Sequence, residues 1–260
     1  MSGTPDSPLA PSDLPEMVRR IRARTPARLL AGRSGAAYLT RTQLELREAH
    51  AAARDAVREE LSLFEAFGRE FATRWPLVEV RTKARNKDEY LLRPDLGRHF
   101  DDRSRVLIEE RCSPGADLQI AIGDGLSVLA VATQVPPLLP LLHQGAQRRR
   151  WSVAQVLVIH HCRVGVLNEI GELLDPKVAV LLIGERPGLA TADSLSAYMA
   201  YHPRELHTDA NRNLISNIHA RGLRSEVAAE RILNFAVQMM EAKISGSTLR
   251  EQAPALGNSR

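Results

Sequence analysis

The chain has 260 residues, 44% of them hydrophobic and 25% charged, and this ordinary balance excludes a disordered or collagen-like protein. Its 35 Lys and Arg against 31 Asp and Glu give a net charge of +4. The two signs alternate along the sequence and do not form the one-sided basic cluster of a nucleic-acid-binding protein, so we expect no nucleic-acid partner. Cys112 and Cys162 stand apart without a CxxC pair, which argues against a disulfide scaffold or a zinc ribbon.

Residues 1–30 are predicted to be a flexible, Pro- and Arg-rich N-terminal segment. The first fifteen residues are too poor in apolar side chains to order themselves, and Pro26 limits any later helix to a short one. This segment lacks the apolar core of a signal peptide. The longest apolar run, 129–142, contains three Pro and falls short of the roughly 18 residues of a membrane span. We therefore expect a cytoplasmic protein without a membrane partner.

Residues 31–111 are predicted to form a helical N-terminal region. From Thr40 the sequence is rich in Ala, Leu, Glu and Arg and has the period of an amphipathic helix. Residues 75–81 alternate like a strand, and 88–93 (DEYLLR) are expected to add a second strand before a Pro-Asp turn. A helical pattern returns over 98–112.

Residues 112–260 change character, because runs of branched apolar residues alternate there with helical patterns. Such runs are typical of strands buried on both faces of a parallel sheet, and each is followed by a polar or Gly-bearing turn. The expected strands are 118–122, 155–160 and 178–183, and the expected helices are 127–149, 167–174 and 225–243. The predicted fold is therefore α/β, a Rossmann-like parallel sheet domain with a helical N-terminal extension.

In such sheets ligands bind at the carboxyl ends of the strands. The turn 184–188 (GERPG) offers glycines for close backbone approach, an acceptor in Glu185 and a planar donor in Arg186. The same two residues also suit a solvated charge pair in a turn. The turn 123–127 (GDGLS) suits either an anion cradle or a simple turn, and it does not match the GxGxxG fingerprint.

Other site chemistries find little support. His160 and His161 are adjacent in a strand, so their side chains point to opposite faces and do not suit one metal. A GxSxG elbow is lacking, which leaves hydrolase chemistry without a motif. Cys162 beside Arg163 is the one candidate nucleophile, although such a Cys is more often a small buried hydrophobe. We expect no metal site and no catalytic residue.

Five separated blocks occur in the order in which one enzyme family carries them: RPDLGR (93–98), QIAIGDGLS (119–127), IGERPGL (183–189), SLSAY (194–198) and ISNIH (215–219). With them the chain closely resembles the small subunit of ethanolamine ammonia-lyase. The likeness extends from about Ala31 to the final helix.

This resemblance implies an adenosylcobalamin-dependent lyase that converts ethanolamine to acetaldehyde and ammonia, with the cofactor carrying the difficult step. In that family the large subunit, a TIM barrel, holds the substrate, and the small subunit closes over part of the base-on corrinoid and its nucleotide tail. The expected partner is therefore a large subunit, in a hetero-oligomer of several large and small pairs. The expected role of this chain is essential but non-catalytic, and the family is often packed inside bacterial microcompartments.

The resemblance also implies cofactor contacts, position by position. Val164 follows the Arg of the strand-end RV pair, Glu185 is the Glu of GERPG, and Leu214 precedes ISNIH. Arg163 and Arg186 are their neighbours and are expected to assist. Some family members have Cys where this chain has Leu214, and a contact that needs a thiol would not survive that change.

Residues 217–222 (NIHARG) differ by one position from the DxHxxG signature in which a protein His replaces the cobalamin's own base. That signature needs an Asp to orient the His, and the family is base-on, so His219 is not expected to ligate the metal. Two alternatives to the lyase interpretation remain at this point. One is a stand-alone Rossmann-like module that binds cobalamin or a nucleotide as carrier or regulator, and the other is an interaction protein that only stabilises a partner.

Overall fold

A computed structural model describes residues 16–24, 33–188 and 191–251. The predicted flexible first fifteen residues lie outside this part of the chain. Within the described residues the main sheet has six strands, in the spatial order β3-β5-β4-β6-β7-β8. Their bounds are β3 Leu77–Arg81, β4 Leu118–Gly123, β5 Val156–His160, β6 Val178–Gly184, β7 Leu195–Tyr201 and β8 Asn213–Ile218.

The sheet is mixed. β3, β5, β4 and β6 run parallel, whereas β7 pairs antiparallel with β6 and β8 pairs antiparallel with β7. The predicted α/β class and the three predicted strands of the second half are confirmed. The prediction of a parallel sheet is wrong for β7 and β8, which complete the sheet as antiparallel strands after the last βα unit. β3 comes from the 31–111 region, so the sheet draws on both predicted regions.

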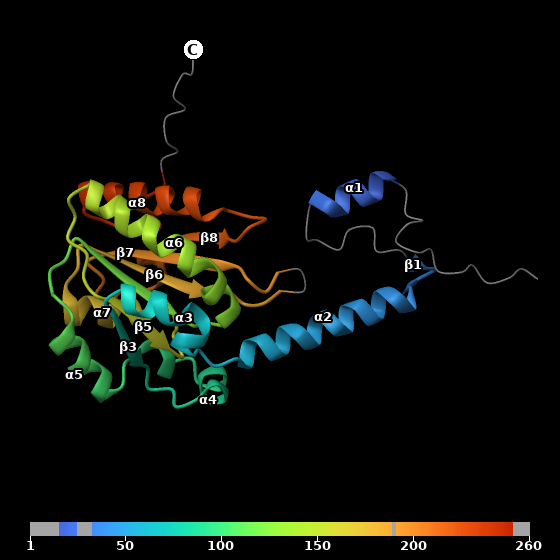
Figure 1. Ribbon diagram of the computed structural model, residues 1–260, viewed down its shortest axis with the longest axis horizontal. Helices are drawn as coiled ribbons and strands as arrows, with labels where there is room; N and C mark the ends of the chain where they lie inside the picture. Colours follow the sequence, from blue (N-terminus) through green and yellow to red (C-terminus); the bar gives the residue numbers. More distant parts are fainter. Residues whose placement is uncertain (1–15, 25–32, 189–190, 252–260) are drawn as a thin grey trace, which may run out of the picture.

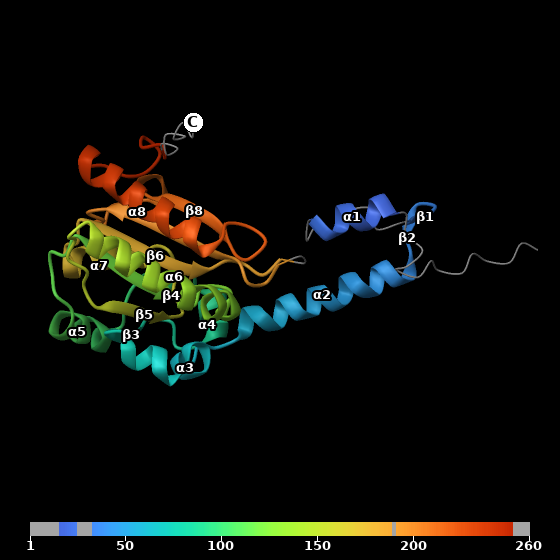
Figure 2. The ribbon, with the colours of Figure 1, turned by 45° about the horizontal axis from the view of Figure 1, so that its top comes forward.

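Helices cover both faces of the sheet (Figures 1 and 2). α3, α6 and α8 pack on one face, and α5 and α7 pack on the other. α2 extends away from the body, with a small antiparallel pair, β1 and β2, before it. The bounds are α1 Glu16–Arg24, β1 Arg33–Ser34, β2 Ala37–Tyr38, α2 Thr40–Arg58, α3 Leu63–Arg74, α4 Lys87–Leu92, α5 Asp102–Arg111, α6 Val128–Arg148, α7 Val166–Leu174 and α8 Ser225–Ala242, with 3-10 turns at Leu96–Arg98 and Asp209–Asn211.

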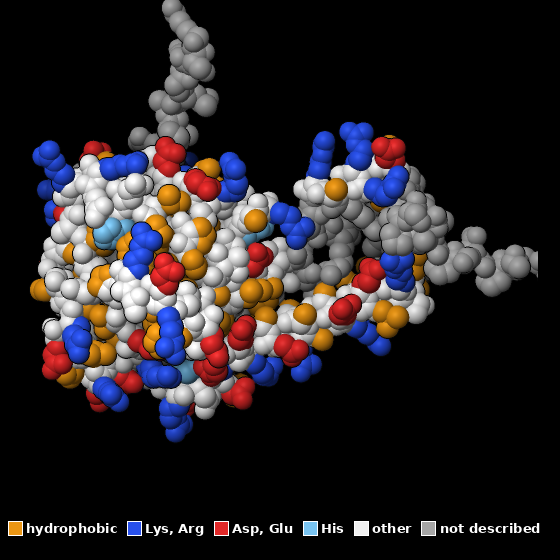
Figure 3. Space-filling view, in the orientation of Figure 1, with side chains coloured by type: hydrophobic (Ala, Val, Ile, Leu, Met, Phe, Trp, Pro, Cys, Tyr) orange, Lys and Arg blue, Asp and Glu red, His pale blue; other side chains and the backbone are white. Residues whose placement is uncertain are grey.

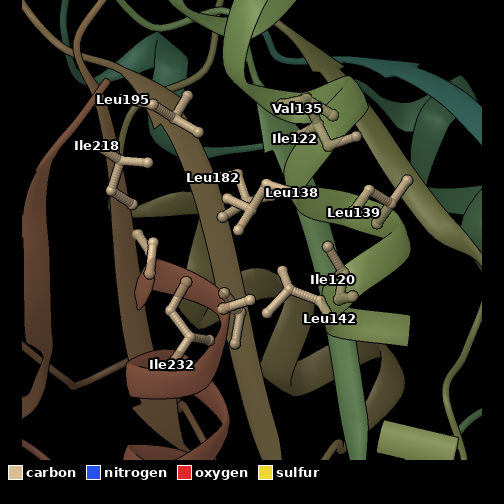
Figure 4. Packing of buried hydrophobic residues seen from close by; sticks show 14 of the residues in the cluster. Ile120, Ile122, Val135, Leu138, Leu139, Leu142, Leu182, Leu195, Ile218 and Ile232 are labelled. Atoms are coloured by element: carbon tan, nitrogen blue, oxygen red, sulfur yellow. The ribbon is translucent and has the colours of Figure 1, made fainter. Parts of the chain in front are cut away.

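The larger core lies between the sheet and the α6–α8 layer (Figure 4). Leu138, Leu139 and Leu142 of α6 are fully buried there, against the inward-facing residues of β4 and β6. A second core lies between the sheet and α5 and α7. The central strands are therefore buried on both faces, as their continuous apolar runs predict.

The segment 88–93 is not the strand predicted for it. It lies in α4, whose N-cap Asn86 accepts a hydrogen bond from the Glu89 N–H at 2.9 Å. Glu89 in turn accepts hydrogen bonds from the Arg85 backbone N–H at 2.8 Å and from its guanidinium. These local caps satisfy the donors at the start of a helix and outweigh the apolar alternation of six residues.

The helices predicted for 127–149, 167–174 and 225–243 are confirmed to within one or two residues as α6, α7 and α8. The helical stretch from Thr40 is two helices, because the chain is extended at Glu59 and Ser62 between α2 and α3. Among the described helices, none combines the length and apolarity that a bilayer crossing requires.

Candidate ligand site beside the uncovered part of the sheet

α5 and α7 leave the edge strand β8 uncovered at Leu214, whereas Ser196 and Ala200 of β7, on the same face, are buried. Tyr198 of β7 lies directly opposite Leu214 of β8 in the antiparallel register, so both side chains point to the same face. Tyr198 packs against the core under α5 and α7, which identifies that face as the one these helices cover elsewhere. Leu214 is 47% exposed. We call the side of β7 and β8 that carries Ser196, Tyr198 and Leu214 the open face.

A cavity of about 900 Å³ lies next to the open face. Its walls come from the turn after α4, from α5 and α7, and from the segment between β7 and β8. They include Arg98, Arg105, Val164, Asn168, Tyr198 and Arg212. This volume is at the upper end of the range for small-molecule and cofactor sites.

The cavity wall is balanced in charge. Among the described residues that line it, four Arg face four carboxylates, and ion pairs join Arg105 to Glu169 and Arg212 to Asp209. Glu169 is 6% exposed and also accepts the Phe100 backbone N–H at 2.8 Å. Burial lowers the pKa of the Arg212 guanidinium, and the neighbouring Asp209 opposes that shift. A wall of this kind suits a large ligand with many uncharged hydrogen-bonding groups better than a polyanion.

Charged side chains of both signs are also interspersed over the molecular face drawn in Figure 3. A large single-sign field, which would steer a strongly charged ligand, is not a feature of that face. Recognition of a ligand at the cavity therefore depends on local contacts.

The loop after β5 brings Arg163 and Val164 to the cavity. The Arg163 guanidinium lies over the ring of Tyr90, 4.1 Å from its centroid, and donates to the Tyr90 carbonyl at 3.2 Å. The charged group of Arg163 therefore contacts Tyr90 on the side of the wall away from the cavity. Val164 is half-buried and presents an apolar surface to the cavity.

Glu185 follows β6 and reaches across to β7 and β8. Its Oε1 accepts hydrogen bonds from Ser196 Oγ at 2.7 Å and from the Asn217 N–H at 2.9 Å. Ser196 is two residues from Tyr198 in β7 and therefore lies on the open face. Both bonds use the same oxygen, which leaves Oε2 for a further donor. Arg186 is exposed next to it.

The GDGLS turn after β4 is closed by the chain itself. The Leu126 N–H donates to the Gly184 carbonyl at 3.1 Å, and Ser127 Oγ donates to the Ala192 carbonyl at 2.5 Å. A Cβ on Gly125 would lie 2.4 Å from the Gly184 carbonyl oxygen, so glycine is required for this close approach. Of the two interpretations of this turn, the structure favours the simple turn, and none of its residues lines the cavity.

Of the predicted residues, Val164 lines the cavity, Leu214 lies on the open face, and Glu185 is hydrogen-bonded to Ser196 of that face; Glu185 and Leu214 are not part of the cavity wall. Arg163 lines the cavity from behind, and Arg186 stays at the surface. Sequence reasoning missed Tyr198 and Arg212 as site residues. Tyr198 lies within the SLSAY block and could have been identified from it, whereas nothing in the pattern around Arg212 indicates its burial.

The histidines have separate partners. His160 Nε2 lies 2.6 Å from Glu79, and His161 Nε2 lies 2.8 Å from Glu60. His219 uses Nε2 toward Asn217 Oδ1 at 2.7 Å and accepts the Arg221 N–H at Nδ1, within its own turn. A search of the described part of the chain finds no group of three or more His, Cys, Asp or Glu arranged to hold a metal ion.

Both cysteines are buried, and we expect both to react slowly with a thiol reagent in the native protein. Burial raises the pKa of the Cys112 thiol to about 11 and that of Cys162 well above its ordinary value. At pH 8 the thiolate fraction of Cys112 is therefore roughly a hundredfold below that of a free cysteine. Ellman's reagent should titrate both thiols promptly only after denaturation. A native burst of one equivalent would contradict this assignment.

Comparison with known proteins gives the same family from a family model and from individual relatives, over most of the chain. The family model of the ethanolamine ammonia-lyase light chain (EutC) matches residues 15–250. The ethanolamine ammonia-lyase small subunit of Clostridium perfringens is 40% identical over 235 residues, which cover 90% of this chain and 78% of that protein. The small subunits of Listeria monocytogenes and Pseudomonas syringae pv. tomato are each 39% identical, over 89% and 90% of this chain and 77% and 82% of their own lengths.

Proposed function

The chain belongs to the ethanolamine ammonia-lyase light-chain family, and from this premise we propose that it is the small subunit of an adenosylcobalamin-dependent enzyme that converts ethanolamine to acetaldehyde and ammonia. Its role is to enclose the corrinoid cofactor against a large catalytic subunit. The main support is the position of Val164 in the cavity wall and of Glu185 and Leu214 at the open face next to it, although the three residues come from separate segments.

The residues present fit such a ligand. A corrinoid is bulky, with apolar edges and a periphery of neutral carboxamides. The cavity of about 900 Å³ has room for part of such a molecule, and its wall is charge-balanced. Next to it Leu214 offers apolar surface, and Glu185 Oε2 offers an acceptor for an amide N–H.

The proposed division of work assigns this chain no reacting group. When bound, adenosylcobalamin supplies the cobalt–carbon bond on which the radical chemistry of this class of lyase depends. Val164 and Leu214 provide apolar contact, Glu185 accepts a hydrogen bond, and Arg163 and Arg186 border the ligand. Residues 112–260 are proposed to supply most of the Rossmann-like cobalamin-binding domain, to which the predicted N-terminal region 31–111 adds β3 and α5. We propose the base-on form of the cofactor, in which no protein histidine replaces its own base. Both ring nitrogens of His219 already have hydrogen-bond partners within the turn of that residue.

The large subunit is the proposed partner, in a hetero-oligomer of several large and small pairs. Leu214 on the open face is nearly half exposed in this chain alone, so the chain does not itself cover a cofactor bound there. Radical chemistry needs an enclosed cofactor, and a second subunit placed over this face supplies the enclosure. A small subunit alone is therefore expected to be inactive.

Co-expression tests the proposal. The chain is tagged and purified with an ethanolamine ammonia-lyase large subunit, and acetaldehyde is measured from ethanolamine with and without adenosylcobalamin, with each subunit alone as control. Activity of the copurified pair only, and only with cofactor, is the expected result. A stable pair that neither binds cobalamin nor produces acetaldehyde would leave a structural role, and failure to pair would favour the stand-alone binding module.

Replacing Glu185 with Ala is expected to weaken cobalamin binding by the pair about tenfold, because one ligand acceptor and two bonds to β7 and β8 are lost. Glu185→Gln keeps a carbonyl oxygen for the same donors and should lose less. Spectrophotometric titration with adenosylcobalamin measures both. The matched control is Asp117→Ala: Asp117 also accepts a backbone N–H, from Ser152 at 2.8 Å, but it lies before the start of β4 and outside the cavity wall. Equal affinities for Glu185→Ala and the unmodified pair would remove Glu185 from the site.

For location we propose the cytoplasm, inside a bacterial microcompartment where the host forms shells. We propose that the N-terminal segment is the targeting sequence. A fluorescent protein fused to residues 1–25 should concentrate with the shells in shell-forming cells, and a diffuse signal would remove this proposal.

A further inference from the structure

A buried ion pair lies behind the cavity, at the carboxyl ends of β4 and β5. Asp124 is fully buried, and its Oδ2 lies 2.9 Å from the ammonium of Lys87, which is 4% exposed. The Lys87 ammonium also donates to the Gly125 carbonyl at 3.0 Å and lies 5.0 Å from the centroid of the Tyr90 ring. Neither member of the pair lines the cavity.

Asp124 holds the start of the loop that follows β5. Its Oδ2 accepts the His161 N–H at 3.0 Å, and its Oδ1 accepts the Cys162 N–H at 2.8 Å. His161 has a φ of 57°, a left-handed conformation that a residue other than glycine rarely adopts without outside restraint. We call residues 161–164 the site loop, because it ends at Val164 in the cavity wall.

The segment between β3 and α5 holds the site loop from the other side. Thr82 Oγ1 donates to the His161 carbonyl at 3.0 Å, and Tyr90 Oη donates to the Cys162 carbonyl at 3.1 Å. The Arg163 N–H donates to the carbonyl of Gly97 at 2.8 Å. The path of the loop is thus set by groups outside it.

Packing leaves the site loop little freedom to shift. A Cβ on Gly97 would lie 2.8 Å from the His161 carbonyl oxygen, and a Cβ on Gly123 would lie 2.6 Å from Cys162 Sγ. Both distances are shorter than real Cβ contacts, so the loop fills the space between the RPDLGR block and the end of β4. Displacement of Asp124 would therefore be transmitted along the loop to Val164.

We propose that Lys87 is a positioning residue for the ligand site. Its ammonium fixes the carboxylate of Asp124, the carboxylate fixes the two N–H groups that begin the site loop, and the loop places Val164 in the cavity wall. A buried ion pair adds little net stability compared with an apolar pair of the same volume, but its charge fixes one geometry. The identity of the ligand as adenosylcobalamin rests on the proposed function, whereas the effect of Lys87 on the loop does not.

Hydrogen exchange of the full-length chain tests the first step. In Lys87→Met the amides of residues 161–164 should exchange about tenfold faster, while the amides of β6 keep their protection. The matched control is Lys177→Met. Lys177 also pairs with an aspartate, Asp117 at 2.7 Å, but it lies at the opposite end of the strands and is 53% exposed. Unchanged exchange in the site loop of Lys87→Met would overturn the proposal.

Cobalamin titration of the copurified pair tests the second step. Lys87→Met should bind adenosylcobalamin about tenfold more weakly than Lys177→Met. The double variant Lys87→Met with Asp124→Asn removes both charges, so it should recover part of the melting temperature. It should not recover the affinity, because the His161 and Cys162 N–H groups bind different oxygens of Asp124, and the Asn amide nitrogen that replaces one of these oxygens cannot accept a hydrogen bond.

The outcomes separate the two proposals. Recovery of affinity together with melting temperature in the double variant would make the pair purely structural and overturn the positioning role. Absence of cobalamin binding by the unmodified pair would contradict the proposed function, and the exchange experiment would still decide the role of Lys87.

Discussion

Replacing Asp124 with Ala is expected to lower the free energy of unfolding by about 3–5 kcal/mol, because a single buried partner of an ion pair is removed. Lys87 would stay 4% exposed without its counter-charge, and the N–H groups of His161 and Cys162 would lose their acceptors. Urea unfolding followed by circular dichroism measures the change. This loss is far larger than the roughly 0.5–1.5 kcal/mol that an ordinary hydrogen bond contributes to stability.

The matched control for Asp124 is Asp88→Ala. Asp88 also forms an ion pair, with Arg58 at 3.5 Å, but its side chain is 78% exposed. Exposed pairs of this kind contribute roughly 0–1 kcal/mol. If the two Ala variants unfold at the same urea concentration, the buried pair does not stabilise the fold.

Replacing Leu138 with Ala is expected to cost about 2–5 kcal/mol through lost burial and a cavity that the core fills only in part. Leu138 is fully buried in α6 and lies over Leu182 of β6 (Figure 4). The control is Leu129→Ala in the same helix, where the side chain is 45% exposed. Leu138→Met keeps most of the volume and should cost less than about 1.5 kcal/mol. A loss for Leu138→Ala no larger than that for Leu129→Ala would show that the α6 contact is not part of a tight core.

The central strands could be predicted from sequence because burial on both faces produces a simple pattern, a continuous apolar run. β4, β5 and β6 are buried on both faces, so nearly every position must be apolar. β7 and β8 were not identified as strands. β8 carries exposed polar residues at Ser216 and Asn217, and nothing in its pattern separates it from a loop. The antiparallel part of the sheet depends on the pairing of β7 with β6 and of β8 with β7. The residue pattern of one strand does not show which other strand it pairs with.

The site was predictable only in part for the same reason. Val164, Glu185 and Leu214 could be carried over from family motifs, but the motifs do not say which of them share a cavity. Arg98 and Arg212 meet across more than a hundred residues of sequence to line one wall. The Lys87–Asp124 pair was also missed, because an isolated Lys in a charged segment has the same pattern as a solvated one.

The place of β3 in the sheet has a consequence for synthesis. Within the described sheet its one neighbour is β5, and the segments that meet there are about 79 residues apart, as in the bond from Thr82 to His161. At roughly 5–20 residues per second, β3 leaves the ribosome about 4–16 s before its partner exists. Its apolar positions must stay unpaired for that interval, so the pairing of β3 with β5 depends on slow, non-local closure. The antiparallel pairs of β6, β7 and β8 close through much shorter connections soon after they are made.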